Sequence, residues 1–434
     1  MNTLEALNSG KLAGTTHIKL ACGLTSFPPA LFDLADTLEV LDMTDNKLSK
    51  LPDDFGKLKN LKILFLSNNN FTELPSVLAK SPKLSMIGFR NNQIATVPEN
   101  SLPLTTRWLI LTDNAIEILP ESMGDLHLLQ KCMLSGNRLR ALPSTMHKCH
   151  NLELLRIAVN HLEALPAFLL DLPKLSWLAF SANPFSAKHP NCDTPLDEVI
   201  WDELEIRELL GEGASGLIYK ALYEGEEVAL KVFKGDITSD GLPQEEMDIN
   251  ISLGRHRHLV DVLAQVTGHP KKKDVLMLEL MPPHFYNLGL PPTLETCSRD
   301  VYPEGFSLTL EKTLKILQSV ADAAIHMHAH GIMHGDFYAH NIMIDDDANV
   351  ILGDFGGASY FEPHEVETRN ALEHLEVRAF GCLVEELLHL SQNDQTNSQL
   401  KVALTNIKLS CLTKTNAKRP LFTQIHQQLC HLRR

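Results

Sequence analysis

The sequence predicts two domains of different classes: an α/β solenoid of stacked repeats, followed by a domain of mixed strands and helices. Two observations support this prediction. One motif recurs seven times at intervals of 22 or 23 residues and stops near Phe185, after which a glycine-rich pattern typical of a strand hairpin begins. In addition, 434 residues are too many for one ordinary hydrophobic core.

The repeated motif is L-x-x-L-x-L-x-x-N-x-L, as in "LEVLDMTDNKL" at residues 38–48. Its asparagines are Asn46, Asn69, Asn92, Asn114, Asn137, Asn160 and Asn183. This pattern and period are typical of leucine-rich repeats, in which each repeat supplies a short strand and neighbouring repeats bury a shared core. We therefore expect a leucine-rich-repeat horseshoe over residues 14–186, with about seven 23-residue repeats after an N-terminal cap.

The outward-facing strand positions of the repeats form the expected concave binding face. The third position is apolar in six of seven repeats, and an exposed apolar stripe usually marks an interaction surface. The predicted partner-binding residues are Phe65, Trp108, Ile110, Met133, Arg156 and Trp177. The alternative is that these positions are buried between neighbouring strands or covered by the second domain. The repeated asparagines are expected to be structural, because their amides can satisfy backbone groups where the chain leaves each strand.

The second half contains four motifs in a fixed order. After a linker or cap at residues 187–201, residues 206–233 read as strand, glycine loop, strand, turn and strand, and "VALK" there supplies Lys231. The glycines Gly211, Gly213 and Gly216 form G-x-G-x-x-G. A strand and not a helix follows them, which argues against a dinucleotide-binding unit. "HGDFYAHN" at 334–341 and "GDFGG" at 353–357 complete the series.

Through these motifs, residues 202–432 resemble the α+β, two-lobed domain of eukaryotic-type protein kinases, and the whole chain resembles a leucine-rich-repeat protein kinase. The resemblance implies ATP and Mg²⁺ as cofactors, serine or threonine hydroxyls as acceptors, and a protein partner or substrate recruited by the repeats. Two alternatives stay open: a nucleotide-binding pseudokinase that acts as a scaffold, and a kinase for a small-molecule hydroxyl.

The resemblance also implies roles for individual residues. Asp336 would accept the proton of the attacking hydroxyl, and Asn341 and Asp354 would hold Mg²⁺. Lys231 would hold the α- and β-phosphates and pair with Glu246, with Glu245 as second choice. The remaining nucleotide-binding residues implied by the resemblance are the glycines Gly211, Gly213 and Gly216, the adenine contacts Ile218, Ala229 and Met343, and the hinge from Glu279 to Met281.

The sequence departs from the family's pattern at three points. Gly335 stands where an arginine normally precedes the catalytic aspartate, so we expect activity that does not wait for activation-loop phosphorylation. Tyr338 stands where serine/threonine kinases carry a lysine, and His340 is the only candidate substitute nearby. The activation segment is short, with 22 positions from Asp354 to "EVRAFG", which leaves the choice of acceptor open.

Charge and cysteine content restrict the class of partner and the compartment. Residues 1–196 hold 18 basic and 18 acidic side chains, and residues 197–434 hold 21 and 36, so no basic footprint for nucleic acid is present. No stretch reaches the ~18 apolar residues of a membrane span. The eight cysteines form no C-x-x-C pair and no signal peptide is evident, which favours reduced thiols in the cytoplasm. The sequence does not determine the oligomeric state.

Overall fold

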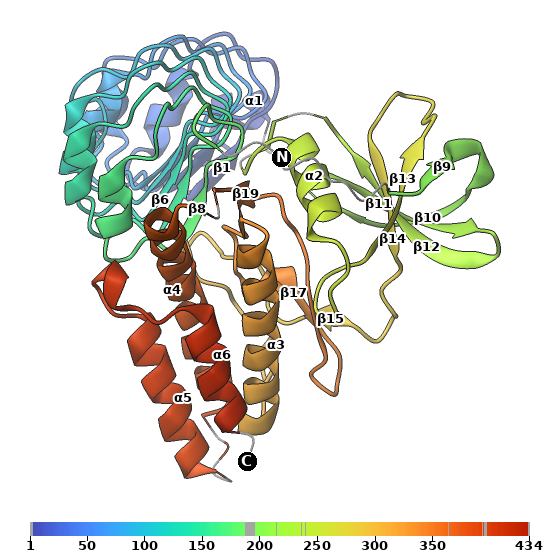
Figure 1. The fold of residues 1–434 in the computed structure, drawn as a ribbon. Helices are drawn as coiled ribbons and strands as arrows, with labels where there is room; N and C mark the ends of the chain where they lie inside the picture. Colours follow the sequence, from blue (N-terminus) through green and yellow to red (C-terminus); the bar gives the residue numbers. More distant parts are fainter. Residues whose placement is uncertain are drawn as a thin grey trace. The chain divides into compact units, whose positions relative to one another are not determined.

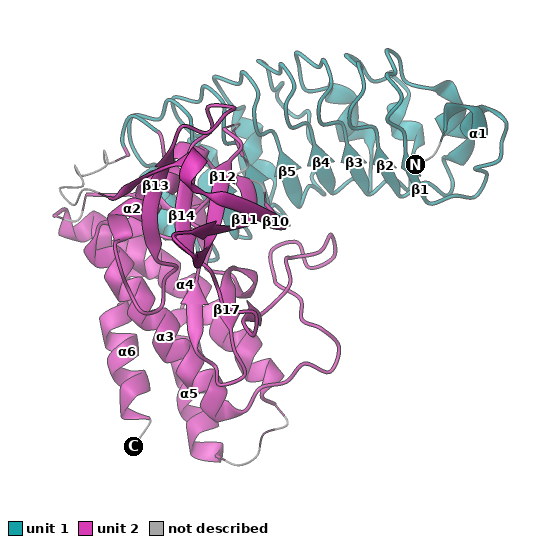
Figure 2. Cartoon of the chain, turned by 90° about the vertical axis from the view of Figure 1, so that its right-hand side faces the viewer, with its two compact units in different colours: residues 1–174, 183–185 teal, residues 175–182, 186–434 magenta. Residues whose placement is uncertain are grey.

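The computed structural model describes residues 3–186, 196–213, 215–235, 237–238, 240–362, 364–392, 394 and 397–432. The chain forms two compact units, residues 1–174 with 183–185 and residues 175–182 with 186–434 (Figure 2). This division differs from the predicted domain boundary, because residues 175–182 belong to the second unit although their sequence completes the seventh repeat. Residues 187–195 of the predicted linker lie outside the described residues.

The first unit is a solenoid of parallel strands that begins with a short helix, α1 (Leu4–Asn8). Each strand pairs in parallel with the next one along the chain. The strands are β1 (His17–Lys19), β2 (Val40–Asp42), β3 (Ile63–Phe65), β4 (Met86–Gly88), β5 (Trp108–Ile110), β6 (Lys131–Met133) and β7 (Leu154–Arg156). Short 3₁₀ turns lie between most of them, at Pro29–Leu34, Phe55–Lys57, Ser76–Lys80, Glu121–Asp125, Ser144–Lys148 and Ala167–Asp171. The predicted leucine-rich-repeat fold is therefore confirmed, and β1 extends it into the N-terminal cap.

The repeated asparagines join successive turns of the solenoid. Asn69 is typical: its Nδ2 donates to the carbonyls of Met43 and Leu66 at 3.0 and 3.1 Å, and its Oδ1 accepts from the Leu48 amide at 2.9 Å. The side chain is buried, so these contacts satisfy backbone groups that water does not reach. The asparagines are thus structural.

Side-chain burial divides the predicted concave-face residues into two sets. Phe65, Trp108 and Ile110 keep part of their surface exposed. In contrast, Met133, Arg156 and Trp177 are only 8%, 2% and 1% exposed. The prediction that these three are accessible anchors is therefore wrong. Met133 is covered from a neighbouring strand, where Trp108 Nε1 lies 3.4 Å from its Sδ, whereas Trp177 stacks on Tyr338.

The second unit starts with an N-terminal lobe that contains a six-stranded sheet and one helix. The strand order is β10-β11-β12-β14-β13-β9. The strands are β9 (Glu198–Ile200), β10 (Glu205–Glu212), β11 (Gly216–Tyr223), β12 (Glu226–Phe233), β13 (Val262–Thr267) and β14 (Val275–Glu279), and the helix is α2 (Pro243–Leu253). β9 comes from the predicted linker and pairs in parallel with β13. One apolar cluster of this lobe contains Ala229, Phe233, Met247, Leu276 and Leu278.

The C-terminal lobe is mainly helical (Figure 1). Its helices are α3 (Leu310–Ala329), α4 (Val366–Leu390), α5 (Ser398–Cys411) and α6 (Phe422–His431). Its small sheets consist of β15 (Tyr286–Asn287), β17 (Ile342–Ile344) and β18 (Val350–Leu352), and of β16 (Ile332–Met333) and β19 (Ser359–Tyr360). The same unit includes β8 (Trp177–Ala179) and short turns at Trp201–Glu203, Ala339–Asn341 and Asn416–Lys418. Within the described part of the chain, none of the helices has the length and hydrophobicity that crossing a membrane requires.

Candidate active site

The glycine motif forms the hairpin between β10 and β11. Gly211 pairs with Ile218 across a register shift, and the Gly213 amide donates to the Gly216 carbonyl at 2.9 Å. A Cβ on Gly216 would lie 2.8 Å from the Val232 carbonyl oxygen, so the packing of β11 on β12 requires glycine there. A Cβ on Gly211 or Gly213 would meet no atom within 4 Å. The space beside these two glycines is therefore available to a ligand.

A buried ion pair links β12 to α2. Lys231 Nζ contacts Glu246 Oε1, and Glu246 is only 1% exposed. Proline at the first position of α2 places Glu246 in the first helical turn. Burial opposes the charge on Lys231, but Glu246 and then Asp354 raise its pKa, so the ammonium persists. The pairing uses Glu246 and not the second choice, Glu245. Ile249 and Leu253, three and seven residues after Glu246, are buried in the core.

The predicted adenine contacts come from both lobes. Ala229 pairs with Leu278 across β12 and β14, and Ile218 packs against the same apolar cluster. Met343 lies half-buried on β17 of the C-terminal lobe. In the predicted hinge, the Glu279 amide donates to the Asp261 carbonyl at 3.0 Å, and Met281 is half-buried. Both lobes thus supply apolar side chains that are suited to packing against the flat adenine ring.

The catalytic-loop motif is held together by short-range hydrogen bonds. Asn341 Nδ2 donates to both the carbonyl oxygen and Oδ2 of Asp336, at 3.0 Å each. The Gly353 amide donates to the Asn341 carbonyl at 3.0 Å, which ties the loop to the segment before Asp354. The ring centroids of His334 and Phe355 lie 5.4 Å apart. These hydrogen bonds therefore fix the position of the Asn341 side chain relative to the Asp336 carboxylate.

Glu376 is a functional residue that the sequence analysis missed. This carboxylate is 1% exposed, and it accepts from the amides of His334 and Gly335 at 3.3 and 2.7 Å. His328 Nε2 also lies 2.7 Å from it. Glu376 thus anchors the start of the catalytic loop to α4. The available signal was a carboxylate at the start of "EVRAFG", which is apolar apart from Arg378.

Asp354 has a left-handed backbone, with φ of 55°. Residues other than glycine rarely adopt this conformation, and those that do are often found at functional sites. The Gly356 amide donates to Asp354 Oδ1 at 3.3 Å. The pKa of Asp354 is raised, first by burial and then by the negative charge of Glu246, although Lys231 opposes the shift. The site thus concentrates negative charge beside one buried cation.

The structure explains the two unusual loop residues in steric terms. Gly335 has φ of 71°, and a Cβ there would lie 2.4 Å from the Gly357 carbonyl oxygen and 2.6 Å from that of Leu178. An arginine therefore does not fit at this position. Tyr338 is 5% exposed, and its ring stacks on that of Trp177 with centroids 4.4 Å apart and planes at 7°.

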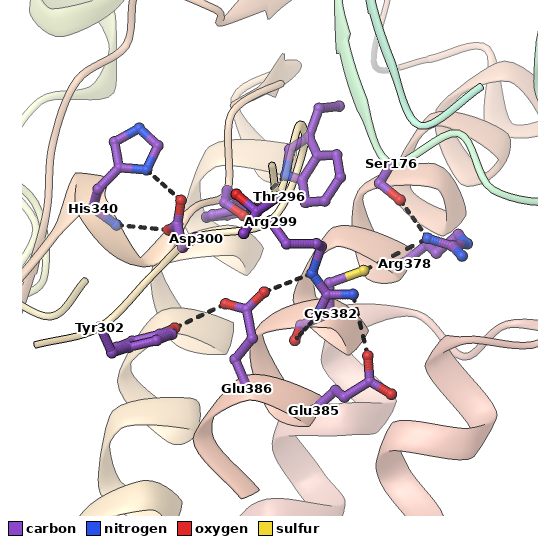
Figure 3. A network of polar contacts seen from close by, with 12 residues as sticks. Ser176, Thr296, Arg299, Asp300, Tyr302, His340, Arg378, Cys382, Glu385 and Glu386 are labelled. Atoms are coloured by element: carbon purple, nitrogen blue, oxygen red, sulfur yellow. Dashed lines mark hydrogen bonds and ion pairs between the residues drawn. The ribbon is translucent and has the colours of Figure 1, made fainter. Parts of the chain in front are cut away.

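A polar network supports the other end of the loop (Figure 3). Asp300 accepts from the His340 amide at 3.0 Å, and its Oδ1 lies 2.7 Å from His340 Nδ1. Burial opposes protonation of His340, but Asp300 raises its pKa overall. Arg299 Nε and the Tyr302 hydroxyl both donate to Glu386 of α4, at 2.6 and 2.8 Å. The sequence analysis did not identify this role for the segment before α3.

The activation segment is short because α4 begins early. The helix begins at Val366, well before "EVRAFG", and occupies sequence in which the family's pattern would continue the loop. Before the helix, the Ser359–Tyr360 strand pairs with β16, and the Tyr360 hydroxyl donates to Ser252 Oγ of α2 at 2.8 Å. The segment thus contacts both the C-terminal lobe and α2.

Comparisons with known proteins agree with this geometry. Residues 204–376 match the family model for a protein kinase domain, and residues 23–94 match the leucine rich repeat model. A probable serine/threonine-protein kinase of Dictyostelium discoideum is 24% identical over 266 residues, which make up 52% of this chain and 28% of that relative. A putative L-type lectin-domain containing receptor kinase of Arabidopsis thaliana is 33% identical over 163 residues, or 36% of this chain and 29% of the relative.

The proto-oncogene serine/threonine-protein kinase mos of Sus scrofa is 29% identical over 185 residues, or 40% of this chain and 52% of that protein. The matched parts thus cover about half or less of the length of these relatives. The two family models match different halves of the chain, in the order that the motifs predict. The chain therefore contains leucine-rich repeats followed by a protein kinase domain.

Proposed function

We propose that the chain is an ATP- and Mg²⁺-dependent protein kinase that phosphorylates serine or threonine, and that its repeats recruit a protein partner or substrate. The observation that supports this most strongly is that the buried Lys231–Glu246 pair and the hydrogen-bonded Asp336–Asn341 pair occur in the same compact unit. Phosphoryl transfer needs both pairs, one to hold phosphates and one to accept the proton of the hydroxyl. The serine/threonine kinases among the similar proteins support the choice of acceptor.

The residues of the site fit the cofactors. The oxygens of Asp354 and Asn341 are the kind that Mg²⁺ prefers, and one or two such protein ligands suffice when phosphate oxygens complete the shell. Negative charge on Glu246 and Asp336 contributes to the raised pKa of Asp354, and a divalent cation would relieve this repulsion. The open space beside Gly211 and Gly213 fits phosphates approached by backbone amides.

In the proposed reaction the protein positions the reactants and supplies charge. When bound, ATP provides the phosphoryl group and Mg²⁺ screens its negative charge. Lys231, kept charged by Glu246, holds the α- and β-phosphates. Asp336 accepts the proton of the serine or threonine hydroxyl, and Asn341 fixes the orientation of its carboxylate through the bond to Oδ2. Glu376 holds the backbone of the loop that carries both residues.

Partner recruitment is proposed from the exposed part of the concave face. Phe65, Trp108 and Ile110 retain exposed surface, and Lys131 Nζ lies 4.4 Å above the Trp108 ring. Aromatic residues of this kind often anchor protein interfaces. None of the described cysteines is paired in a disulfide, which supports the proposal that the protein acts in the reducing cytoplasm.

A pseudokinase scaffold is the second candidate function. The observation that favours it is the Tyr338 side chain, which offers no cation where the family places a lysine. Phosphate incorporation separates the two functions. The purified chain is incubated with labelled ATP and Mg²⁺, with itself and generic basic proteins as acceptors, beside Asp354→Ala.

We expect label on serine or threonine that Asp354→Ala abolishes. Asp346→Ala is the matched control, because Asp346 is an exposed aspartate in the turn between β17 and β18. That variant should incorporate label like the unmodified chain. Absence of label despite measurable ATP binding would contradict the kinase proposal and support the scaffold. Label in a small alcohol but not in proteins would instead indicate the small-molecule kinase.

A further inference from the structure

The strand of the seventh repeat has two roles. By sequence, β8 (Trp177–Ala179) completes the series of repeats, yet it lies in the same compact unit as the catalytic loop. All three of its residues are buried. The question is therefore what a repeat strand contributes to a phosphoryl-transfer site.

Trp177 makes two contacts with consecutive residues of the catalytic loop. Its indole Nε1 donates to the Phe337 carbonyl at 3.1 Å. Its ring stacks almost parallel on Tyr338, with centroids 4.4 Å apart. A buried indole usually has a hydrogen-bond partner, and here that partner is the backbone next to Asp336. One side chain thus restrains both the backbone and a side chain of the loop.

These contacts reach the reacting groups through the backbone of Tyr338. The Tyr338 amide donates to the Asp336 carbonyl at 2.8 Å, and the Asn341 amide donates to the Tyr338 carbonyl at 3.1 Å. Asp336 and Asn341 are in turn joined through their side chains at 3.0 Å. A shift of Tyr338 would therefore move the proposed proton acceptor and the proposed metal ligand together.

The residues beside Trp177 contact the elements around the loop. The Leu178 carbonyl leaves no room for a side chain at Gly335, which lies directly before Asp336. The Phe180 amide donates to Ser359 Oγ in the activation segment at 3.0 Å. Arg378 of α4 donates to Ser176 Oγ at 2.6 Å, as Figure 3 shows. The strand thus joins the catalytic loop, the activation segment and α4.

We propose that Trp177 is a positioning residue of this site, which holds Tyr338, and through it Asp336 and Asn341, in the arrangement needed for transfer. The last repeat strand thereby orders the catalytic loop permanently, at the place where kinases of the family use an arginine and a phosphorylated loop. This inference rests on the proposed kinase function. It gives Trp177 a role inside the site in place of the predicted role in binding a partner.

The test compares two changes at Trp177 in the full-length chain. Trp177→Phe keeps an aromatic ring for the stack and removes only the N–H donor, whereas Trp177→Leu removes both contacts. We expect Trp177→Leu to lower kcat by about tenfold to a hundredfold while KM for ATP changes much less, because Lys231 and the glycine hairpin lie outside the loop that Trp177 restrains. Trp177→Phe should fall between that variant and the unmodified chain.

Two further variants separate positioning from general packing. Tyr338→Leu should lower kcat like Trp177→Leu, and the double variant should be little worse than either one, because both remove the same contact. Trp201→Leu is the control, since Trp201 is a half-buried tryptophan of the same unit that packs against the apolar core of the N-terminal lobe and contacts His269. It should leave kcat within about twofold of the unmodified value.

Hydrogen exchange supplies a measurement that needs no catalysis. Amides of residues 334–341 should exchange faster in Trp177→Leu, while those of α5 and α6 keep their protection. Unchanged kcat in a folded Trp177→Leu variant, or unchanged exchange at 334–341, would overturn the inference. If the unmodified chain transfers no phosphate, the kinase proposal fails by itself, and the exchange data still decide whether Trp177 orders the loop.

Discussion

Burial determines which cysteine thiols of this chain react. Among the cysteines that the structure describes, Cys22 and Cys430 are exposed, whereas Cys132, Cys149, Cys297, Cys382 and Cys411 are buried. Burial raises the pKa of Cys149 to about 11 and that of Cys411 to about 12. Because the thiolate is the nucleophile, a raised pKa lowers reactivity at any pH below it.

We therefore expect Cys22 and Cys430 to be alkylated rapidly at pH 8 in the folded chain. Only about one in a thousand Cys149 thiols and one in ten thousand Cys411 thiols are ionised at that pH, so these two should be labelled only after unfolding. Peptide mapping by mass spectrometry measures each site, with the urea-unfolded chain as control. Labelling of Cys411 as fast as that of Cys430 in the folded chain would contradict the prediction.

The second prediction at this scale concerns the Lys231–Glu246 pair. Glu246→Gln leaves the Lys231 ammonium buried without its counter-charge, and breaking a buried pair in this way costs roughly 3 kcal/mol. We expect a lower urea midpoint for the kinase unit and strongly reduced phosphate transfer. Glu245→Gln is the matched control and should cost less than about 1 kcal/mol. Equal midpoints for the two variants would show that the pair is not important for stability.

At the scale of elements, the activation segment and the start of α4 determine how activity is regulated. The family's arginine clamp for a phosphorylated loop does not fit at Gly335, and the segment is already paired with β16 through Ser359–Tyr360. We therefore expect phosphatase treatment to leave the rate of transfer within about twofold of the untreated value. The measurement is the rate of phosphate transfer to a basic acceptor protein, compared between the untreated chain and the chain dephosphorylated by a phosphatase that is then removed. A tenfold loss that returns on incubation with ATP would show that the chain does require phosphorylation.

The solenoid strands depend on the repeated asparagines. Asn69→Ala leaves the buried Leu48 amide without its acceptor, which costs about 1–3 kcal/mol. The carbonyls of Met43 and Leu66 each lose one of their donors and keep another, from Asn46 and Asn92. We expect faster hydrogen exchange in β2 and β3, because neighbouring repeats stabilise one another. Asn60→Ala serves as control, since that exposed side chain bonds only at the surface. Equal exchange in the two variants would refute the structural role of Asn69.

Local patterns predict elements well and contacts between distant segments poorly. The leucine periodicity predicted the repeat strands. The order of the four motifs predicted that Lys231, Asp336 and Asp354 lie in one two-lobed domain. The contact of Trp177 with the Phe337 carbonyl joins residues 160 positions apart. No local pattern reveals such a pair, so Trp177 reads as an exposed repeat residue. Glu376 and Asp300 escaped notice for the same reason, because their partners lie about forty residues away in the chain.

For the whole molecule, the uneven charge distribution is the property with a functional consequence. Residues 197–434 hold 21 basic and 36 acidic side chains, whereas residues 1–196 are balanced. An acidic surface attracts basic segments, and salt screens this attraction. We expect KM for a serine peptide with basic flanks to rise several-fold between about 50 and 300 mM NaCl. The same peptide with acidic flanks is the control, and its KM should not rise; similar salt dependence for both peptides would exclude electrostatic selection.

The close packing at Gly335 also bears on how such chains diversify. The Leu178 carbonyl would lie 2.6 Å from any Cβ at that position, and the adjacent Trp177 stacks on Tyr338. Positions in two different sequence motifs therefore share one set of steric constraints. We expect them to be inherited together: a lineage that regains arginine at 335 must first displace the strand of the last repeat. In a combinatorial library at positions 177, 335 and 338 that is selected for activity, the residues at the three positions should vary together. Few active clones should carry a substitution at one position alone.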